Sequence, residues 1–251
     1  QQQGLNSDLK GLSSLEVLKK IIEYAETVDL YIILDNHSRH ADGYLNESLW
    51  YTADVSEDQW IADWKTVVET FKDNPNFIGA DLNNEPHDEA TWDAWKEAAE
   101  KCADEILAIR PDLLILVEGV EDDSQGRSYW WGGNLSDVRY NPINNDFIPT
   151  SNLVYSPHEY GPTVWPQEWF NDPTFPDNMT AIWDDYFWFI HKEKRAPLLI
   201  GEFGIKNEHA ADPSSTDYIW FTEFLKYVGH ETSWTFWCMN PNSGDTGGIL
   251  Q

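Results

Sequence analysis

Helical and strand-like hydrophobic patterns alternate along the whole chain. Residues 14–28 place leucine, isoleucine and alanine at the spacing of one helical face. The run LYIILDNH (30–37) that follows begins with continuous apolar residues, which is typical of a strand buried on both faces. The same alternation predicts further helices at 56–72, 89–110, 179–194 and 215–228, and further strands at 77–82, 113–120, 152–160, 197–201 and 233–241.

Residues at the helix boundaries support this assignment. Ser56 is placed to cap the second helix, with Gln59 three residues later, and Pro111 ends the third. The chain has 251 residues, enough for one sizeable core, and no segment is typical of an interdomain linker. We therefore expect residues 1–251 to form a single domain.

Polar residues follow almost every predicted strand. Parallel strands with functional groups at all their carboxyl ends favour a (β/α) barrel over a doubly wound sheet, which gathers ligand groups at one switch point. No glycine-rich phosphate or dinucleotide turn is present. The predicted fold class is α/β, an incomplete TIM (β/α)8-type barrel with six recognisable parallel strands.

Composition narrows the range of partners. The chain has 16 basic and 44 acidic residues, a formal net charge of -28. Nucleic acids and anionic membranes repel such a polyanion, so neither is expected as a partner. Salt screens repulsion among surface carboxylates, so the acidic surface predicts salt tolerance. No run of 18 apolar residues is present that would span a membrane.

Two glutamates carry the strongest chemical signal. Glu85 lies in NNEPH after the strand at 77–82, and Glu202 lies in LLIGEFG after the strand at 197–201. Two carboxylic acids at the ends of parallel strands are what hydrolysis of a glycosidic bond requires. Glu118 follows a similar strand but is interpreted as structural.

Other reactive side chains give weaker signals. The histidines show no metal-ligand spacing such as HExxH, so no metal site is predicted. Cys102 and Cys238 are expected to be buried thiols rather than a disulfide. The chain has 14 tryptophans, and those in loops after strands could stack on sugar rings.

An ordered set of motifs resembles glycoside hydrolase family 5, and most closely its bacterial endo-β-1,4-glucanases. The motifs cover nearly the whole chain in family order: IILDNH, LWYT, GADLNNEPHD, LLILVEGV, YWWGGNL, LVYSPHEY, WFNDPTFPDNM, IGEFG and WTFWCMNPNSGDTGGIL. The resemblance implies an endo-acting β-glucan hydrolase that needs no cofactor.

The resemblance also implies roles for individual residues. Glu85 resembles the general acid/base and Glu202 the nucleophile. Asn84 resembles the amide that holds the sugar 2-hydroxyl. The remaining substrate-binding residues that the resemblance suggests are His37, His158, Tyr160, Trp237, Trp50, Trp130, Trp131 and Trp165.

The chain also departs from the family pattern. Two family strands that precede LYIILDNH, the second bearing an arginine near the nucleophile, are not recognisable, and neither is the last helix. Arg39 is not assigned to that role. The expected open side of the barrel would expose strand edges at LYIILD and SWTFW, which predicts self-association, most simply as a homodimer. The first residues lack the features of a signal peptide, so a secreted protein would be present here in its mature form.

The expected mechanism is double displacement, with the two carboxyl groups roughly 5 to 5.5 Å apart. We expect the Glu202 charge and partial burial to raise the pKa of Glu85. Hydrogen bonds, including one from Tyr160, are expected to keep Glu202 ionised. A mannanase or other β-glycanase of the same family, and an inactive carbohydrate-binding barrel fragment, remain as alternatives.

Overall fold

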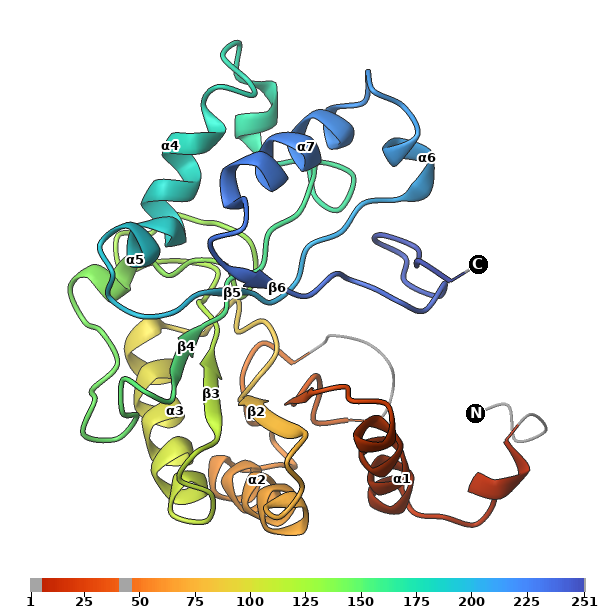
Figure 1. The fold of residues 1–251 in the computed structure, drawn as a ribbon. Helices are drawn as coiled ribbons and strands as arrows, with labels where there is room; N and C mark the ends of the chain where they lie inside the picture. Colours follow the sequence, from red (N-terminus) through yellow and green to blue (C-terminus); the bar gives the residue numbers. More distant parts are fainter. Residues whose placement is uncertain (1–5, 41–46, 251) are drawn as a thin grey trace.

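Parallel strands alternate with outer helices in the computed structural model, which describes residues 6–40 and 47–250 (Figure 1). The strands are β1 (Ile32–Asp35), β2 (Phe77–Asp81), β3 (Leu114–Val117), β4 (Leu153–Tyr155), β5 (Leu199–Ile200) and β6 (Ser233–Trp234). The α-helices are α1 (Ser14–Thr27), α2 (Glu57–Phe71), α3 (Trp92–Leu107), α4 (Met179–Trp183), α5 (Phe189–Lys192), α6 (Asn207–Ala210) and α7 (Thr216–Val228). A π turn (Asp184–Trp188) joins α4 to α5, and short 3-10 turns cover Ser7–Leu9, Ser136–Arg139 and Glu168–Asn171.

The strands follow one another in chain order around an incomplete barrel. One sheet has the order β1-β2-β3-β4 and a second pairs β5 with β6, all in parallel. Parallel bridges from Tyr155 to Leu198 and from His158 to Glu202 connect the two sheets. Sequential order without a switch point agrees with the barrel prediction and not with a doubly wound sheet. The six predicted parallel strands are confirmed.

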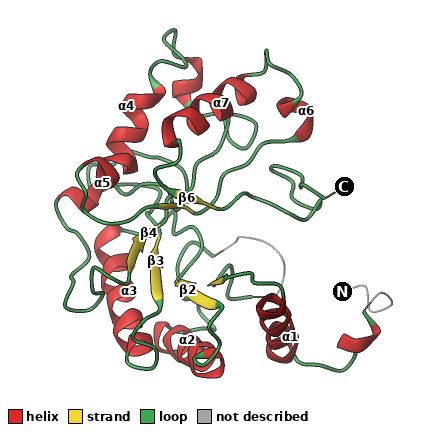
Figure 2. Cartoon of the chain, viewed as in Figure 1, coloured by secondary structure: helices red, strands yellow, loops and turns green. Residues whose placement is uncertain are grey.

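The last predicted strand is much shorter than the run 233–241. Regular pairing stops at Trp234, although the amides of Thr235 and Trp237 still donate to the carbonyls of Ile200 and Phe203 at 3.0 and 2.9 Å. These separate bonds hold the chain beside β5 without forming a ladder. Residues after Trp234 therefore form loops at the rim of the barrel (Figure 2).

Helix starts follow the predicted capping chemistry. The Ser56 hydroxyl accepts a hydrogen bond from the Gln59 amide at 3.2 Å, as expected for the start of α2. Ser13 forms a full capping box with Glu16 at the start of α1. Each cap satisfies backbone donors that the first helical turn leaves free.

Indoles on the outer helices fix the strand ends that carry the polar residues. Trp60 and Trp64 on α2 both donate to the Leu82 carbonyl, at 3.1 and 2.9 Å. Trp95 on α3 donates to the Glu118 carbonyl at 2.9 Å. Because all three rings are buried, these bonds form away from competing water and hold the chain directly after β2 and β3.

Trp50 belongs to this buried layer, so its predicted role in sugar stacking is wrong. Its side chain is 2% exposed and packs on Trp60 and Trp95, with ring centroids 6.5 and 5.2 Å away. Its indole N–H donates to Glu57 at 2.9 Å. The ring is a core residue, because packing against neighbouring indoles leaves almost none of it exposed.

Strand edges remain unpaired at both ends of the described sheet. β1 pairs only with β2, and β6 only with β5, among the described residues. Apolar side chains near these edges are exposed, including Tyr31 at 72% and Trp234 at 51%. Both edges could pair with another strand. Among the described residues, no helix is long and apolar enough to cross a membrane.

Candidate active site

Glu85 lies on the loop directly after β2 in a strained backbone conformation. Its φ of 48° is in the left-handed region, which a non-glycine residue adopts at a cost of about 1–3 kcal/mol. The Glu85 amide donates to the Glu118 carboxylate at 2.8 Å. Glu118 is 1% exposed, so this bond holds the Glu85 backbone from beneath. Its structural interpretation agrees with this contact.

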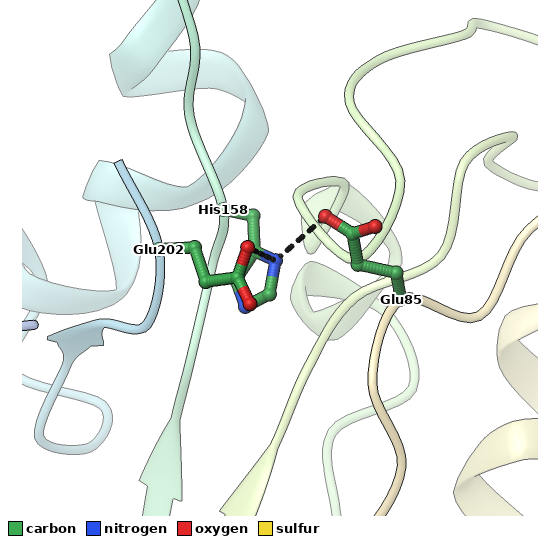
Figure 3. A group of neighbouring side chains, drawn as sticks. All are labelled: Glu85, His158 and Glu202. Carbon is green, nitrogen blue, oxygen red and sulfur yellow. Dashed lines mark hydrogen bonds and ion pairs between the residues drawn. The ribbon is translucent and has the colours of Figure 1, made fainter. Parts of the chain in front are cut away.

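Glu85, His158 and Glu202 converge above the ends of β2, β4 and β5 (Figure 3). One carboxylate oxygen from each glutamate and a ring nitrogen of His158 all lie within 4.8 Å of one another. His158 Nδ1 is 2.9 Å from Glu85 Oε1 and 3.7 Å from Glu202 Oε2. Two carboxylates whose nearest oxygens lie at most 4.8 Å apart are close enough to act on the same bound atom.

Burial dominates the acidity of both glutamates. It raises the pKa of Glu85 to about 7, and the pKa of Glu202 also to about 7. The predicted rise for Glu85 is present, but desolvation is its main cause. For Glu202, the expectation of a firmly ionised carboxylate is not met, because desolvation outweighs the favourable influence of His158 and Tyr160. Near neutral pH the two groups together hold about one proton.

Tyr160 favours the ionised form of Glu202. Its hydroxyl donates to Glu202 Oε2 at 2.7 Å, and burial raises the tyrosine pKa well above its usual value. The hydroxyl therefore stays protonated and stabilises the ionised form of Glu202.

His158 is held as a neutral bridge below the pair. The imidazole is 2% exposed, and burial lowers its pKa. Its Nε2 lies 3.4 Å from Glu118 Oε1. A Cβ at Gly201 would come within 2.9 Å of Nε2, so only glycine allows the histidine to lie against the strand. Gly132 similarly leaves room for Glu118, since its Cβ would lie 2.2 Å from Oε2. Sequence reasoning missed both glycines.

A second group of carboxylates lies inside the barrel below the first. Asp35, Asp81 and Glu118 each offer an oxygen within 4.8 Å of the others, a spacing that could hold a cation. Burial raises the pKa of Asp81 and Glu118 well above the usual range. Protons can therefore neutralise this cluster, and the predicted chemistry of the upper pair requires no metal.

The cleft above the carboxylates is about 510 Å³ and is lined by aromatic rings. It contains His37, Tyr160, Trp130, Trp131, Trp165 and Trp237 from the predicted set. His37 stacks on Trp237 with centroids 5.3 Å apart, and His87 stacks on Trp131 at 3.7 Å. Burial opposes protonation of His37, but its hydrogen bond to Asp35 and nearby carboxylates raise its pKa overall.

Asn84 lies just outside this lining. Its side chain is 2% exposed, and its Nδ2 has no hydrogen-bond partner among the described residues. It lines the smaller cavity of about 200 Å³ beneath Glu202. A buried amide donor without a partner therefore lies beside the carboxylates.

Glu121, Tyr129 and Asp245 are among the cleft residues that were not predicted. They lie in loops after β3 and β6, where sequence spacing does not show which side chains turn inward. Glu121 begins the polar EDDSQGRS run and Tyr129 follows it, and the position of this run after a strand was the one available signal.

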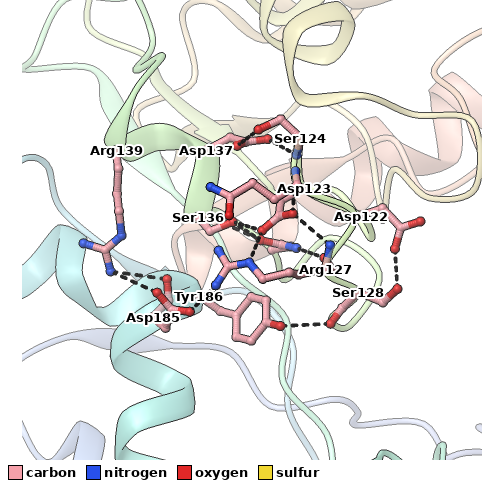
Figure 4. Close-up of polar contacts among 12 residues, drawn as sticks. Asp122, Asp123, Ser124, Arg127, Ser128, Ser136, Asp137, Arg139, Asp185 and Tyr186 are labelled. Atoms are coloured by element: carbon pink, nitrogen blue, oxygen red, sulfur yellow. Dashed lines mark hydrogen bonds and ion pairs between the residues drawn. The ribbon is translucent and has the colours of Figure 1, made fainter.

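A polar network pins the loop that carries Tyr129, Trp130 and Trp131 (Figure 4). Arg127 Nε donates to Asp123 at 2.7 Å, and its terminal nitrogen reaches Asp185. The Tyr186 hydroxyl donates to the Ser128 carbonyl at 3.2 Å. The loop after β3 is thereby joined to the π turn between α4 and α5, which fixes one wall of the cleft.

Comparison with curated proteins finds similar sequences among bacterial endoglucanases. An endoglucanase of Paenibacillus polymyxa is 45% identical over 98% of this chain and 62% of its own length. The major extracellular endoglucanase of Xanthomonas campestris pv. campestris is 40% identical over 98% of this chain and 51% of its own length. The chain thus spans between half and two thirds of the length of these relatives.

Solved structures with the same fold include an endoglucanase and an endocellulase. The catalytic domain of the Xanthomonas campestris pv. campestris major endoglucanase aligns with a TM-score of 0.88 at 39% identity, over 98% of this chain and 71% of that one. A variant endocellulase of Pyrococcus horikoshii in complex with cellotetraose aligns with a TM-score of 0.88 at 37% identity, over 99% and 72%. The family model described as cellulase (glycosyl hydrolase family 5) matches residues 2–243, so this chain belongs to glycosyl hydrolase family 5.

Proposed function

We propose that this protein is an endo-β-1,4-glucanase that cleaves internal bonds of cellulose or related β-glucans with retention of configuration. The observation that carries the proposal is the approach of the Glu85 and Glu202 carboxylates within 4.8 Å at the base of an aromatic cleft. Relatives named endoglucanases, and the cellotetraose complex of a similar fold, support the choice of a glucan. The proposal concerns a chain that spans 62% of the Paenibacillus polymyxa relative.

In the proposed first step, Glu85 donates its proton to the leaving glycosidic oxygen while a Glu202 oxygen attacks the anomeric carbon. The C–O bond to the leaving group breaks as the glycosyl–Glu202 ester forms. Tyr160 donates to Glu202 Oε2 and orients the carboxylate. In the second step, ionised Glu85 takes a proton from water, and the water oxygen displaces Glu202.

The substrate-binding roles remain part of the proposal. Trp237, which lies parallel to His37, offers an indole face beside the reacting sugar. Trp131 and the 66%-exposed Trp165 would extend the stacking surface, and Trp130 would contribute an edge of the cleft wall. Asn84 offers its unpaired amide to the 2-hydroxyl.

Substitution of the two glutamates tests the mechanism. Glu202→Gln should abolish hydrolysis of a soluble β-glucan while the far-UV spectrum and melting curve persist. Retention of activity within about tenfold of wild type would refute the nucleophile assignment. Glu85→Ala should recover on substrates with good leaving groups, and azide should then yield a β-glycosyl azide. Failure to form this product would refute the acid/base assignment.

Substrate preference separates the glucanase from its alternatives. Hydrolysis of hydroxyethylcellulose should exceed that of galactomannan. The opposite order would favour a mannanase, and binding without hydrolysis would favour a carbohydrate-binding fragment.

Three properties of the wider protein are also proposed. The unpaired edges at β1 and β6, with exposed Tyr31 and Trp234, support self-association as a two-fold dimer, which sedimentation at micromolar concentration would test.

The net charge of -28 supports salt tolerance, so the melting temperature should hold or rise up to about 2 M NaCl. Similarity to a major extracellular endoglucanase supports secretion, which fractionation of the source culture would test.

A further inference from the structure

Two carboxylates outside the catalytic pair line the cleft. Glu121 lies on the loop after β3 and Asp245 on the loop after β6, so each belongs to a different wall. Neither lysine nor arginine is among the described residues that line the cleft, and His37 is its one basic side chain. The walls are therefore more acidic than catalysis by two glutamates requires.

Glu121 is held in place at its wall. Its Oε2 accepts a hydrogen bond from the Asp88 amide at 3.1 Å, and its own carbonyl accepts from the Tyr129 amide at 3.0 Å. Both bonds attach Glu121 to segments that carry other cleft residues. Its half-buried charge is thus a fixed feature of the wall rather than a mobile surface charge.

Asp245 is positioned by the turn that contains it. Ser243 and Gly247 form an antiparallel bridge across the turn, and Ser243 Oγ accepts from Trp237 Nε1 at 3.1 Å. This hydrogen bond holds the turn against the Trp237 indole, which lines the same cleft as the two glutamates. The Asp245 charge acts on the groups at the base of the cleft, since it contributes to the raised pKa of both Glu85 and Tyr160.

We propose that Glu121 and Asp245 form an acidic rim that selects uncharged β-glucan chains over chains bearing carboxylates. The inference rests on the proposed glucanase function and specifies its substrate class. A carboxylate on a bound sugar would lie between two negative charges, with neither lysine nor arginine among the described lining residues to offset them. The repulsion between a substrate carboxylate and these side chains is weak to moderate in water, and salt screens it. A chain that carries cationic groups would be attracted by the same charges.

Three polymers with the same backbone test the acidic rim: hydroxyethylcellulose (neutral), carboxymethylcellulose (anionic) and quaternary-ammonium hydroxyethylcellulose (cationic). The measured quantity is kcat/KM on each charged polymer divided by kcat/KM on the neutral polymer. The ratios are determined at about 20 mM and about 500 mM NaCl for wild type, Glu121→Gln and Asp245→Asn. Using ratios cancels any change that a substitution causes in catalysis itself.

Asp104→Asn is the matched control, because it removes the same charge from an exposed position. Asp104 lies near the C-terminal end of α3, at the end of the barrel opposite to the cleft. A uniform effect of the net charge of -28 would change the ratios equally in all three variants.

At low salt, each rim substitution should raise the carboxymethyl ratio roughly two- to fourfold and lower the cationic ratio, and high salt should remove most of this difference. Unchanged ratios in both rim variants, or an equal change in Asp104→Asn, would overturn the acidic rim. Affinity electrophoresis in gels that contain the same polymers gives the corresponding binding ratios without turnover. If no polymer is hydrolysed, the proposed glucanase function fails, and the binding ratios still decide whether the rim discriminates by charge.

Discussion

Glu159 is a buried carboxylate outside the catalytic pair, and its removal should change how stability depends on pH. The side chain is fully buried and accepts hydrogen bonds from the Trp183 and Trp220 indoles at 2.9 and 2.8 Å, and from the Tyr129 hydroxyl. Burial raises its pKa from 4.5 to about 7 despite these donors. We consider the substitution Glu159→Gln, which keeps the shape and an acceptor oxygen but cannot ionise.

The sign follows from proton linkage. A carboxyl whose pKa is higher in the folded state binds protons more tightly there, so its contribution to stability is present below pH 4.5 and is lost as pH rises through about 7. One pKa unit corresponds to about 1.4 kcal/mol, so this loss amounts to about 3 kcal/mol. Glu159→Gln removes the pH-dependent term because an amide cannot ionise, and its oxygen can still accept from both indoles.

Urea unfolding followed by tryptophan fluorescence, at fixed ionic strength and at pH values from about 4.5 to 8, measures the effect. As pH rises across this range, the unfolding free energy of Glu159→Gln should increase relative to that of wild type by about 3 kcal/mol. Glu159→Ala is the matched control, since it leaves both indole donors unpaired and should be destabilised at every pH. A difference between Glu159→Gln and wild type that stays constant with pH would refute the reasoning.

Three further substitutions test the support of the site. Tyr160→Phe removes the bond to Glu202, so the acidic limb of the pH–rate profile should move to higher pH and kcat should fall by roughly 10- to 100-fold; an unchanged limb would contradict the role of the hydroxyl. Gly132→Ala should cost more stability and activity than Gly126→Ala, because both have positive φ but only a Cβ at 132 meets the Glu118 carboxylate; equal losses by urea unfolding would contradict this contact. Arg127→Ala should raise KM more than it lowers kcat, because it frees the tryptophan-bearing loop after β3, whereas an unchanged KM would show that the loop is held without it.

Local sequence determined much of the architecture. The spacing of apolar residues located all six strands, since burial on both faces imposes continuous apolar runs. The predicted helix at 179–194 is present but is divided by a π turn, a change in hydrogen bonding that periodicity does not reveal. The strand predicted at 233–241 was too long, because ladder pairing depends on the neighbouring strand as well as on composition.

Motif context located the catalytic candidates more reliably than the stacking residues. Glu85, His158, Tyr160 and Glu202 meet in one site because each lies directly after a strand of the same parallel barrel. Trp50 carried a similar aromatic signal yet lies in the core. An indole has the same sequence signature in either place, and only packing decides which faces are covered.

The order of elements, the barrel class and the pair of glutamates could be predicted from the chain, because they depend on periodicity and on residues adjacent in the sequence. The acidity of Glu85 and Glu202, the support of Glu85 by Glu118, and the acidic walls formed by Glu121 and Asp245 emerged only from the folded arrangement. Desolvation and Coulomb interactions depend on distances between segments far apart in the chain. Those distances are set when the strands close around a common interior.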